Sequence, residues 1–430
     1  MFLVKNGLVI DPANGIRQVM DISVKDGLVA EVAEHIEITE GMEVYDATGK
    51  IVVPGLIDMH VHLREPGLEA KETIASGTRA AAMGGFTSVA CMPNTKPVID
   101  SVALVDAVKA AAARDGIVNV YPIGAITKGS EGQELAEIGD MAQHGVRAIS
   151  DDGKPVPRAE IMRLGMEYSR MFGVTIISHC EDSSLAQDGV MHLGSVSTLL
   201  GLRGIPAAAE EVMVARDIIL AEATGARLHI AHVSTKGSLD LIRAAKARGV
   251  NVTCEVTPHH LMLTDAAVDG YSTDTKVNPP LRPAEHLTAL RAGLREGIID
   301  CIATDHAPHT REEKDVEYAY APFGLVGLET AVPLIMELVK NGELSLEQAV
   351  EALTVKPAGI LGLDKGSLGV GKAADITVID PEMELVLAEA DLESKGKNSP
   401  FLGKELQGFP VLTMVNGKIV MQDRRIVEKE

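Results

Sequence analysis

Apolar runs alternate with alanine-rich amphipathic stretches through the middle of the chain. The runs are apolar at successive positions, so we expect strands that are buried on both faces, as in a parallel sheet. Strands are predicted over 51–62, 87–93, 117–125, 146–152, 174–180, 227–234, 251–259 and 299–308. Helices are predicted between them, over stretches that include 101–114, 206–224, 236–248, 285–297 and 326–340.

Eight strands that alternate with helices predict an α/β protein with a TIM-like (β/α)8 barrel, and a doubly wound open sheet is the alternative. Ser345 followed by Gln348 predicts a capping box that starts one more helix. No GxGxxG motif follows a strand, so a dinucleotide site has no support.

The two ends of the chain share a different pattern. Short alternating strands are separated by Asn-Gly, Asp-Gly and Thr-Gly turn signals in residues 1–50, and the stretches 366–385 and 408–428 look the same. We therefore predict a small β-sandwich domain built from residues 1–52 and 366–430. The barrel, over 53–365, would be inserted between its two parts.

Composition narrows the class of protein. The net charge of −21 argues against a nucleic-acid binder, which needs a basic surface, but one or two local cations could still hold a small anion. The cysteines form no CxxC pair, so a disulfide framework and a thiolate zinc site are not expected. They are Cys91, Cys180, Cys254 and Cys301.

The N-terminal apolar stretch is broken at Lys5 and Asn6, unlike a signal peptide. No apolar run approaches the ~20 residues that a membrane span needs. We therefore expect a soluble, cytoplasmic protein without a membrane partner.

The predicted strands end repeatedly on His or Asp. In a barrel, catalytic residues lie at these ends, and packing alone does not explain the pattern. His60 and His62 are two apart on the first strand, so both imidazoles point to one face and could share a metal ion. Asp58 shares that face and could orient one of them. Later strand ends add ligands of the kind that Zn²⁺ accepts, namely His179, His232 and Asp305.

A second ion would need a bridging anion. Asp151 and Asp152 follow the fourth strand, and adjacent residues on a strand point to opposite faces, so only one should reach the site. The other is expected to be a solvated turn residue or a helix cap.

Several polar residues near strand ends are candidates for substrate chemistry. Asp305 could take a proton from the attacking water and deliver it to the leaving nitrogen. Arg64 offers a fork that could clamp a substrate carboxylate. Asn94, Asn278 and His309 are further contact candidates. Neither a GxSxG motif nor a nucleophilic cysteine pattern supports covalent catalysis.

Two segments, 58–67 and 303–314, resemble the paired signatures of the dihydroorotases, within the amidohydrolase superfamily. The sequence in residues 366–380 is similar to the returning β segment of that superfamily. Other matching motifs follow the family order at 92–95, 150–153, 177–182, 231–235, 256–261 and 276–282. The resemblance covers nearly the whole chain and is closest to the bacterial class I branch.

The resemblance implies a metal site, a substrate site and a reaction. The metal ligands would be His60, His62, Asp152, His179, His232 and Asp305, with Asp305 as the catalytic acid and base. Arg64, Asn94 and His309 would bind the substrate carboxylate, Asn278 would contact the pyrimidine ring, and His62, Phe323 and Gly324 would also contact substrate. The cofactor would be two zinc ions per subunit, with one ion as the alternative. The reaction would be reversible hydrolysis of (S)-dihydroorotate to N-carbamoyl-L-aspartate in pyrimidine synthesis.

Two other functions compete. Allantoinases and hydantoinases also open cyclic amides, but they usually bridge their metals with a lysine and lack an arginine at position 64. A non-catalytic scaffold for aspartate transcarbamoylase is the other alternative, although such proteins usually have metal ligands replaced. The resemblance also allows a homodimer and an active complex with that transcarbamoylase.

Overall fold

Eight parallel strands in the body of the molecule close into a barrel. The computed structural model describes residues 1–427. A three-stranded sheet, β6-β7-β8, and a five-stranded sheet, β9-β10-β13-β14-β15, are joined by bridges between Gly124 and Ile149 and between Val61 and His306. The strands are β6 Leu56–Val61, β7 Phe86–Cys91, β8 Asn119–Pro122, β9 Ala148–Ser150, β10 Thr175–Ser178, β13 Leu228–Ile230, β14 Val252–Val256 and β15 Cys301–Ile302. The predicted barrel is confirmed, and the open sheet is excluded.

Both faces of the barrel strands are apolar because both are covered. Met59, Ala90 and Ile177 belong to a cluster that fills the interior, while Val89 and Ile176 belong to the larger core beneath the helices. This two-sided burial is the physical reason for the continuous apolar runs.

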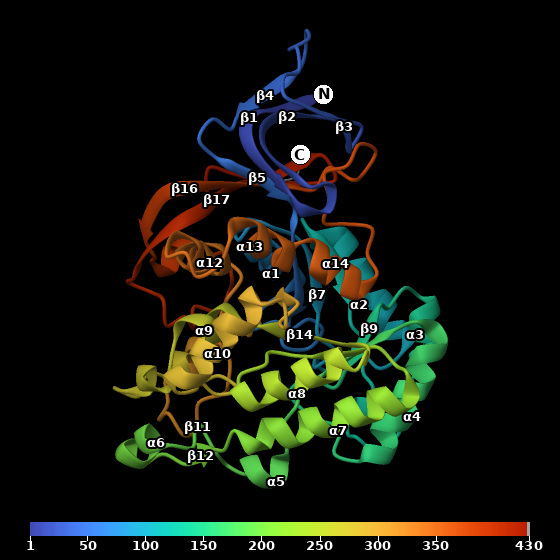
Figure 1. The fold of residues 1–430 in the computed structure, drawn as a ribbon, viewed down its shortest axis with the longest axis vertical. Helices are drawn as coiled ribbons and strands as arrows, with labels where there is room; N and C mark the ends of the chain where they lie inside the picture. The colour runs from blue at the N-terminus through green and yellow to red at the C-terminus, as the bar shows by residue number, and fades with distance from the viewer. Residues whose placement is uncertain (428–430) are drawn as a thin grey trace.

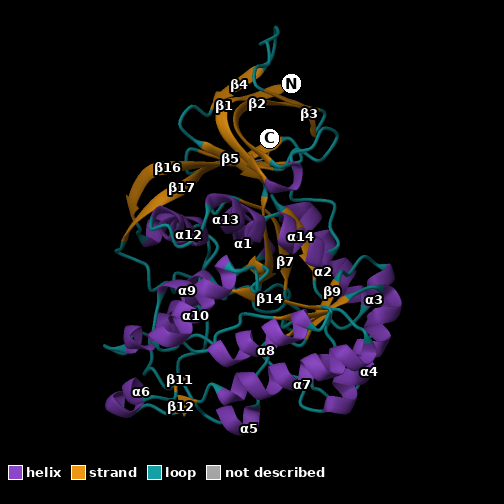
Figure 2. Cartoon of the chain, viewed as in Figure 1, coloured by secondary structure: helices purple, strands orange, loops and turns teal. Residues whose placement is uncertain are grey.

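Helices surround the barrel (Figures 1 and 2). Helix α13 begins as the capping box predicts: Gln348 N donates to Ser345 Oγ at 3.2 Å, and Ser345 N donates to Gln348 Oε1 at 3.1 Å. The longer helices are α1 Ile74–Met83, α2 Val102–Asp115, α4 Ala159–Phe172, α7 Ala208–Thr224, α8 Lys236–Ala247, α10 Ala284–Arg295, α12 Ala331–Lys340 and α13 Leu346–Leu353. The shorter ones are α3 Ile138–Gln143, α5 Ser183–Ala186, α6 Ser195–Leu200, α9 Pro258–Met262, α11 Arg311–Lys314 and α14 Val355–Leu361.

A nine-stranded sheet, formed by the two ends of the chain, lies at one end of the barrel (Figure 1). Its order is β19-β18-β17-β16-β5-β1-β2-β3, and β4 pairs with β1. Val4 and Ile22 from one half share a core with Val378 and Leu412 from the other, so the halves face each other as in a sandwich. The strands are β1 Phe2–Asp11, β2 Ile16–Lys25, β3 Leu28–Ala33, β4 Glu43–Asp46, β5 Ile51–Pro54, β16 Ile376–Val386, β17 Glu405–Val415, β18 Lys418–Gln422 and β19 Arg425–Ile426. A separate pair, β11 Met191–His192 and β12 Gly204–Ile205, lies outside both sheets.

The prediction of a single strand over 51–62 is wrong. Strand β5 belongs to the nine-stranded sheet, which we call the outer sheet, and β6 begins the barrel after Gly55. A Cβ atom at Gly55 would lie 2.1 Å from Thr87 Oγ1, so the close approach at this junction requires glycine.

One predicted turn is also different. Asn6-Gly7 lies inside β1 as a bulge: Asn6 has φ 61°, and the register with β2 shifts between Val4 and Gly7. Asp26-Gly27 and Asn416-Gly417 do connect antiparallel strands, as such dipeptides should.

The domain boundaries proposed from the sequence stay a prediction, and residues 428–430 of the second β segment lie outside the described chain. Between residues 1 and 427, none of the helices has the length and apolar character of a membrane-crossing segment.

Candidate active site

Six side chains converge at the carboxyl ends of the barrel strands, five of them buried and one, Asp305, partly exposed. His60 lies in β6 and His62 just beyond it, while the other four follow β9, β10, β13 and β15. Two overlapping sets of three, both containing His60, have ligand atoms within 4.8 Å of one another. The six residues are those expected from the strand-end pattern and the resemblance, namely His60, His62, Asp152, His179, His232 and Asp305.

Four of these side chains surround one point. His62 Nε2 lies 3.0 Å from Asp305 Oδ1 and 3.5 Å from Asp152 Oδ2. His60 Nε2 lies 3.4 Å from Asp152 Oδ1 and 3.6 Å from Asp305 Oδ1. A zinc ion with bonds of about 2.0–2.1 Å separates its tetrahedral ligands by roughly 3.3 Å, so these spacings fit a metal.

The remaining two histidines lie next to each other and near the same oxygen of Asp152 that His60 approaches. His179 Nδ1 lies 2.9 Å from His232 Nε2, and these atoms are 3.8 and 3.7 Å from Asp152 Oδ1. Asp152 thus lies within 4 Å of all four histidines.

The electrostatics of the cluster also fit a cation. His60 Nε2 and Asp152 Oδ1 are buried and make no hydrogen bond within the described chain. Burial lowers the pKa of His60, but the carboxylates of Asp152 and Glu255 raise that pKa well above its ordinary value. Burial raises the pKa of Asp152, but the neighbouring histidines, His60 first, hold it well below its ordinary value. The site therefore favours positive charge, which a metal ion would supply.

Glu255, in strand β14, supports the cluster and was not predicted from the sequence. Its Oε1 lies 2.6 Å from His60 Nδ1, and its Oε2 lies 3.1 Å from His229 Nε2. The carboxylate accepts the Nδ1–H of His60, which leaves Nε2 as the nitrogen that could bind a metal. The available signal was an ionisable residue inside an otherwise apolar strand.

Asn94 supports His62 in the same way. Its Oδ1 lies 2.9 Å from His62 Nδ1, so the imidazole N–H donates to the amide and Nε2 faces Asp305. The sequence predicts a substrate contact for Asn94, and this contact with a histidine is an additional finding.

Asp58 and Asp151 both differ from expectation. Asp58 does not touch an imidazole: its carboxylate accepts from the backbone N–H groups of His60 and Thr304 and so links the first and last barrel strands. Asp151 is buried rather than solvated, and it accepts from the N–H groups of Ile126 and Thr127. Asp152 is therefore the member of the pair that lies among the histidines.

Asp305 has a strained backbone and an ionised carboxyl group. Its φ is 50°, a left-handed value that non-glycine residues seldom adopt and that clusters at functional sites. Burial raises its pKa, but the hydrogen bond with His62 and the charges of the histidines lower it to about 2. An ionised carboxylate at this point can accept a proton.

Arg64 and His309 lie side by side next to the cluster. Arg64 Nη2 is 3.4 Å from His309 Nε2, and Arg64 Nε donates to Pro308 O at 3.2 Å. Both side chains are buried. Burial, with the charges of Arg64 and Lys71, lowers the pKa of His309 to about 3, so its imidazole is neutral and Nε2–H donates to Phe323 O at 2.8 Å.

The loop that holds Phe323 and Gly324 packs directly on His309. Gly324 has φ 132°, and a Cβ atom there would lie 3.2 Å from His309 Nε2 and 2.7 Å from Ala307 Cβ. Asn278 Oδ1 is buried without a hydrogen-bond partner among the described residues. Asn278, which is predicted to contact the pyrimidine ring, thus has an unused hydrogen-bond acceptor.

Another pair of histidines, His259 and His260, lies in α9 and is buried. His260 Nδ1 lies 2.7 Å from Thr257 Oγ1, and its Nε2 lies 2.9 Å from Pro279 O. The four cysteines are unpaired and buried.

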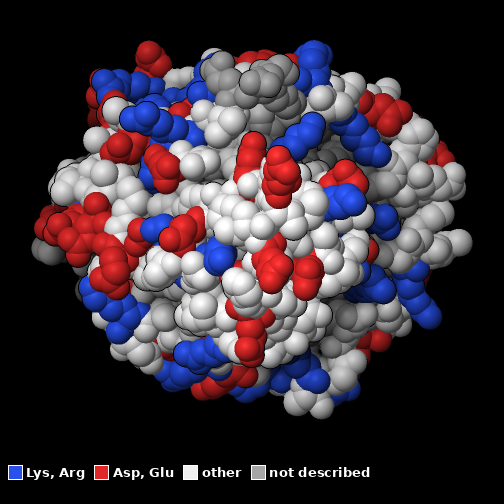
Figure 3. Space-filling model, turned by 90° about the horizontal axis from the view of Figure 1, so that it is seen from above, with Lys and Arg blue, Asp and Glu red and all other residues white. Residues whose placement is uncertain are grey.

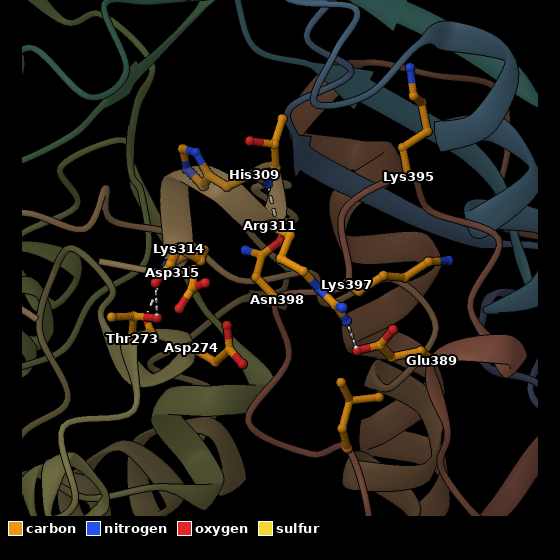
Figure 4. A pocket seen from close by; sticks show the side chains of 12 residues that line it. Thr273, Asp274, His309, Arg311, Lys314, Asp315, Glu389, Lys395, Lys397 and Asn398 are labelled. Carbon is orange, nitrogen blue, oxygen red and sulfur yellow. Dashed lines mark hydrogen bonds and ion pairs between the residues drawn. The ribbon is translucent and has the colours of Figure 1, made fainter. Parts of the chain in front are cut away.

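A cavity of about 530 Å³ lies beside His309 (Figure 4). It is lined on one side by α11 and on the other by the connection between β16 and β17, including Asn398. An ion pair of 2.6 Å between Arg311 and Glu389 crosses from one side to the other.

The same fold occurs in solved structures of hydantoinases. The L-hydantoinase (dihydropyrimidinase) of Arthrobacter aurescens matches with a TM-score of 0.89 and 27% identity, over 100% of this chain and 97% of that one. A D-hydantoinase (dihydropyrimidinase) from Thermus sp. matches with a TM-score of 0.85 and 28% identity over the same shares.

Similarity in sequence identifies the family more specifically than similarity in fold does. Residues 49–238 match the family model "Dihydro-orotase-like", and residues 204–421 match the model "Amidohydrolase family". The dihydroorotase of Pelotomaculum thermopropionicum is 61% identical over 425 residues, which cover 99% of each chain. That of Geobacter sp. (strain M21) is 55% identical over 98% of this chain and 99% of its own. The chain therefore belongs to the dihydroorotase family of amidohydrolases.

Proposed function

We propose that this chain is a zinc-dependent dihydroorotase that reversibly hydrolyses (S)-dihydroorotate to N-carbamoyl-L-aspartate in pyrimidine synthesis. One observation carries the proposal: a buried cluster of histidines and aspartates lies beside a buried arginine at the carboxyl ends of the barrel strands. The cluster suits amide hydrolysis, and the arginine suits a substrate that bears a carboxylate.

The six clustered side chains, Asp152 among them, would hold two zinc ions, and a single ion is the alternative. Bound zinc would supply a Lewis acid that polarises the ring carbonyl and lowers the pKa of water. Glu255 and Asn94 would fix His60 and His62 with their Nε2 atoms toward the metal.

Asp305 would accept the proton of the attacking water and pass it to the ring nitrogen as the amide bond breaks. In the reverse direction the same carboxyl group would take the proton from that nitrogen. Its Oδ1 lies 3.0 Å from His62 Nε2, and 12% of the Asp305 side chain is exposed, so water and substrate could reach it.

Arg64, Asn94 and His309 would receive the substrate carboxylate, and Asn278 would meet the ring. Arg64 is the strongest of these assignments because its guanidinium is buried and no carboxylate forms an ion pair with it within the described chain. Its fixed positive charge suits a planar anion. His62, Phe323 and Gly324 would complete the contacts.

A hydantoinase-like activity fits less well. The proposed bridging residue is Asp152, and the nearest lysine in sequence, Lys154, is exposed. Hydrolysis of dihydroorotate measured against hydantoin and allantoin would separate these functions. Preference for an uncharged ring would contradict the proposal.

The partners are also proposals. The substrate is a small molecule, and the enzyme would act in the cytoplasm as a homodimer, with a complex with aspartate transcarbamoylase as a further possibility. On the face seen in Figure 3, Lys and Arg side chains are interspersed with Asp and Glu. That mixture, together with the net charge of −21, gives no support to nucleic-acid binding.

One experiment tests the function. The purified protein is analysed for bound metal, and dihydroorotate hydrolysis is followed on the same sample before and after chelation. Turnover that a chelator abolishes and zinc restores is expected, and the metal count distinguishes two ions from one. Neither metal nor turnover after zinc is added would favour the scaffold alternative.

A further inference from the structure

The connection between β16 and β17 leaves the outer sheet and packs on the active-site loops of the barrel. Gly396 is so close to Pro308 that a Cβ atom there would lie 2.6 Å from Pro308 Cβ. Val326 N donates to Asn398 O at 3.0 Å. A segment that is distant in sequence thus contacts both the loop after β15 and the loop that follows α11.

Asn398 makes the central contacts of this connection. His309 N donates to its Oδ1 at 3.0 Å. Its Nδ2 donates to Ala307 O at 3.2 Å and to Gly324 O at 3.0 Å. The side chain is buried, with 5% of its surface exposed, so water cannot readily replace these bonds. All three partners are backbone groups, which means that Asn398 fixes the path of the chain rather than one side chain.

The two loops joined by Asn398 are those that shape the environment of Arg64. Pro308 O accepts from Arg64 Nε, and Phe323 O accepts from His309 Nε2. Pro308 is the sequence neighbour of Ala307 and His309, and Phe323 is the neighbour of Gly324. Both carbonyls are therefore adjacent in the chain to backbone groups that Asn398 binds. If the loops separated, Arg64 and His309 would lose their mutual placement.

We propose that Asn398 is a positioning residue for the substrate-carboxylate site, which it keeps assembled by joining the 307–309 and 323–324 backbones. The inference rests on the proposed function, because that function supplies the carboxylate. Asn398 has no hydrogen bond to any of the six clustered side chains in the described structure. Its loss should therefore weaken carboxylate binding and leave proton transfer nearly intact.

The test compares Asn398→Ala with the unsubstituted full-length enzyme, both loaded with zinc. We expect KM for dihydroorotate to rise about tenfold, with kcat within about threefold of the original, since the lost bonds act on binding. Orotate carries the same carboxylate on a planar ring, and its inhibition constant should rise by a similar factor. Bound zinc should be unchanged.

Two further variants keep the test decisive. Asn398→Asp retains the acceptor for His309 N but sets a carboxylate oxygen against the carbonyls of Ala307 and Gly324, so it should raise KM at least as much. If Asn398→Ala does not fold, this variant decides. Lys397→Ala is the matched control, because its ammonium bonds only to Leu392 O in the described chain, and its KM should not change.

Hydrogen exchange gives a readout that does not depend on turnover. The backbone N–H of His309 donates to Asn398 Oδ1, so it should exchange faster in Asn398→Ala, which lacks the acceptor, while the amides of the barrel strands should not.

An unchanged KM in both Asn398 variants, or a loss of kcat and zinc with KM unchanged, would overturn the inference. Absence of dihydroorotate turnover in the unsubstituted enzyme would contradict the proposed function itself, and with it the substrate on which this inference rests.

Discussion

The proposed metal side and the proposed substrate side of the active site are built in different ways. On the metal side, side chains at the ends of barrel strands face one another, and other buried side chains such as Glu255 hold them. On the substrate side, Arg64 and His309 are placed by loops whose backbone carbonyls accept their N–H groups. The metal side is thus fixed by the barrel, whereas the substrate side depends on contacts between distant segments. Changes on the first side should affect chemistry, and changes on the second should affect recognition.

The largest effect is expected at Asp305, where the two sides meet. Asp305→Asn removes the carboxylate that would carry the proton, so kcat should fall about 10³-fold or more, with a smaller change in KM. Steady-state kinetics with parallel zinc analysis separates lost chemistry from lost metal. Asp240→Asn, on the exposed surface of α8, is the control and should behave as the original protein.

Arg64 should produce the opposite kinetic signature. Arg64→Ala should lower kcat/KM for dihydroorotate about 10²-fold, mainly through KM, because a buried guanidinium is lost from the carboxylate site. Arg64→Lys should recover only part of the loss, since an ammonium group cannot form the planar fork. An unchanged KM in Arg64→Ala would show that the carboxylate is held elsewhere.

Glu255 tests whether the metal side depends on its supporting residues. Glu255→Ala should weaken zinc binding about 10- to 100-fold. Glu255→Gln should weaken it less, because an amide oxygen can still accept from His60 Nδ1. Equilibrium competition with a chelator measures both variants.

The control for Glu255 is Glu210→Gln. Glu210 is also buried, but it accepts from Ser234 N and Thr235 N rather than from a clustered histidine. Its substitution should lower stability without changing zinc affinity. Equal zinc affinity in Glu255→Ala and the original protein would refute the supporting role.

The smallest effect on turnover is expected at Glu329, beneath the β16–β17 connection. It accepts from Glu393 N at 2.6 Å, and burial raises its pKa to about 8. A carboxyl group whose pKa is raised on folding makes its full contribution to the free energy of unfolding below about pH 4.5. This contribution is lost as the pH rises through 8, by up to about 1.4 kcal/mol per pH unit.

Glu329→Gln should remove this dependence. Thermal unfolding between pH 5 and 9 should show the original protein losing stability relative to the variant as the pH rises, while kcat at pH 7 stays the same. A difference in unfolding temperature that is constant with pH would show that Glu329 is ionised throughout.

The metal side was far easier to predict from the sequence than the substrate side. His60, His62 and Asp305 follow apolar strands directly, and parallel strands bring their carboxyl ends together. The pattern therefore located the cluster without knowledge of any long-range contact. Glu255 was missed because, inside a strand, it has no positional signal except its charge.

The supports of the substrate side could not be predicted by the same reasoning. Asn398 is 89 residues from His309 and 74 from Gly324, and no local pattern joins them. The outer sheet was predicted from its turn dipeptides, but Asn6-Gly7 proved to be a bulge because Gly7 packs against Val52 and no strand reversal occurs there. Such tertiary contacts override local turn chemistry.

The pairing of β5 with β16 has a mechanical consequence. These strands are antiparallel neighbours, with Ile51 opposite Ile379 and Pro54 opposite Ile376, and the whole barrel lies between them in the chain. Tension applied at the two ends of the chain would pass through the strand pairs of the outer sheet and bypass the barrel. The pairing of β5 with β16 would therefore carry an applied force first. The force would reach the barrel and its cluster of histidines and aspartates only after these two strands had separated.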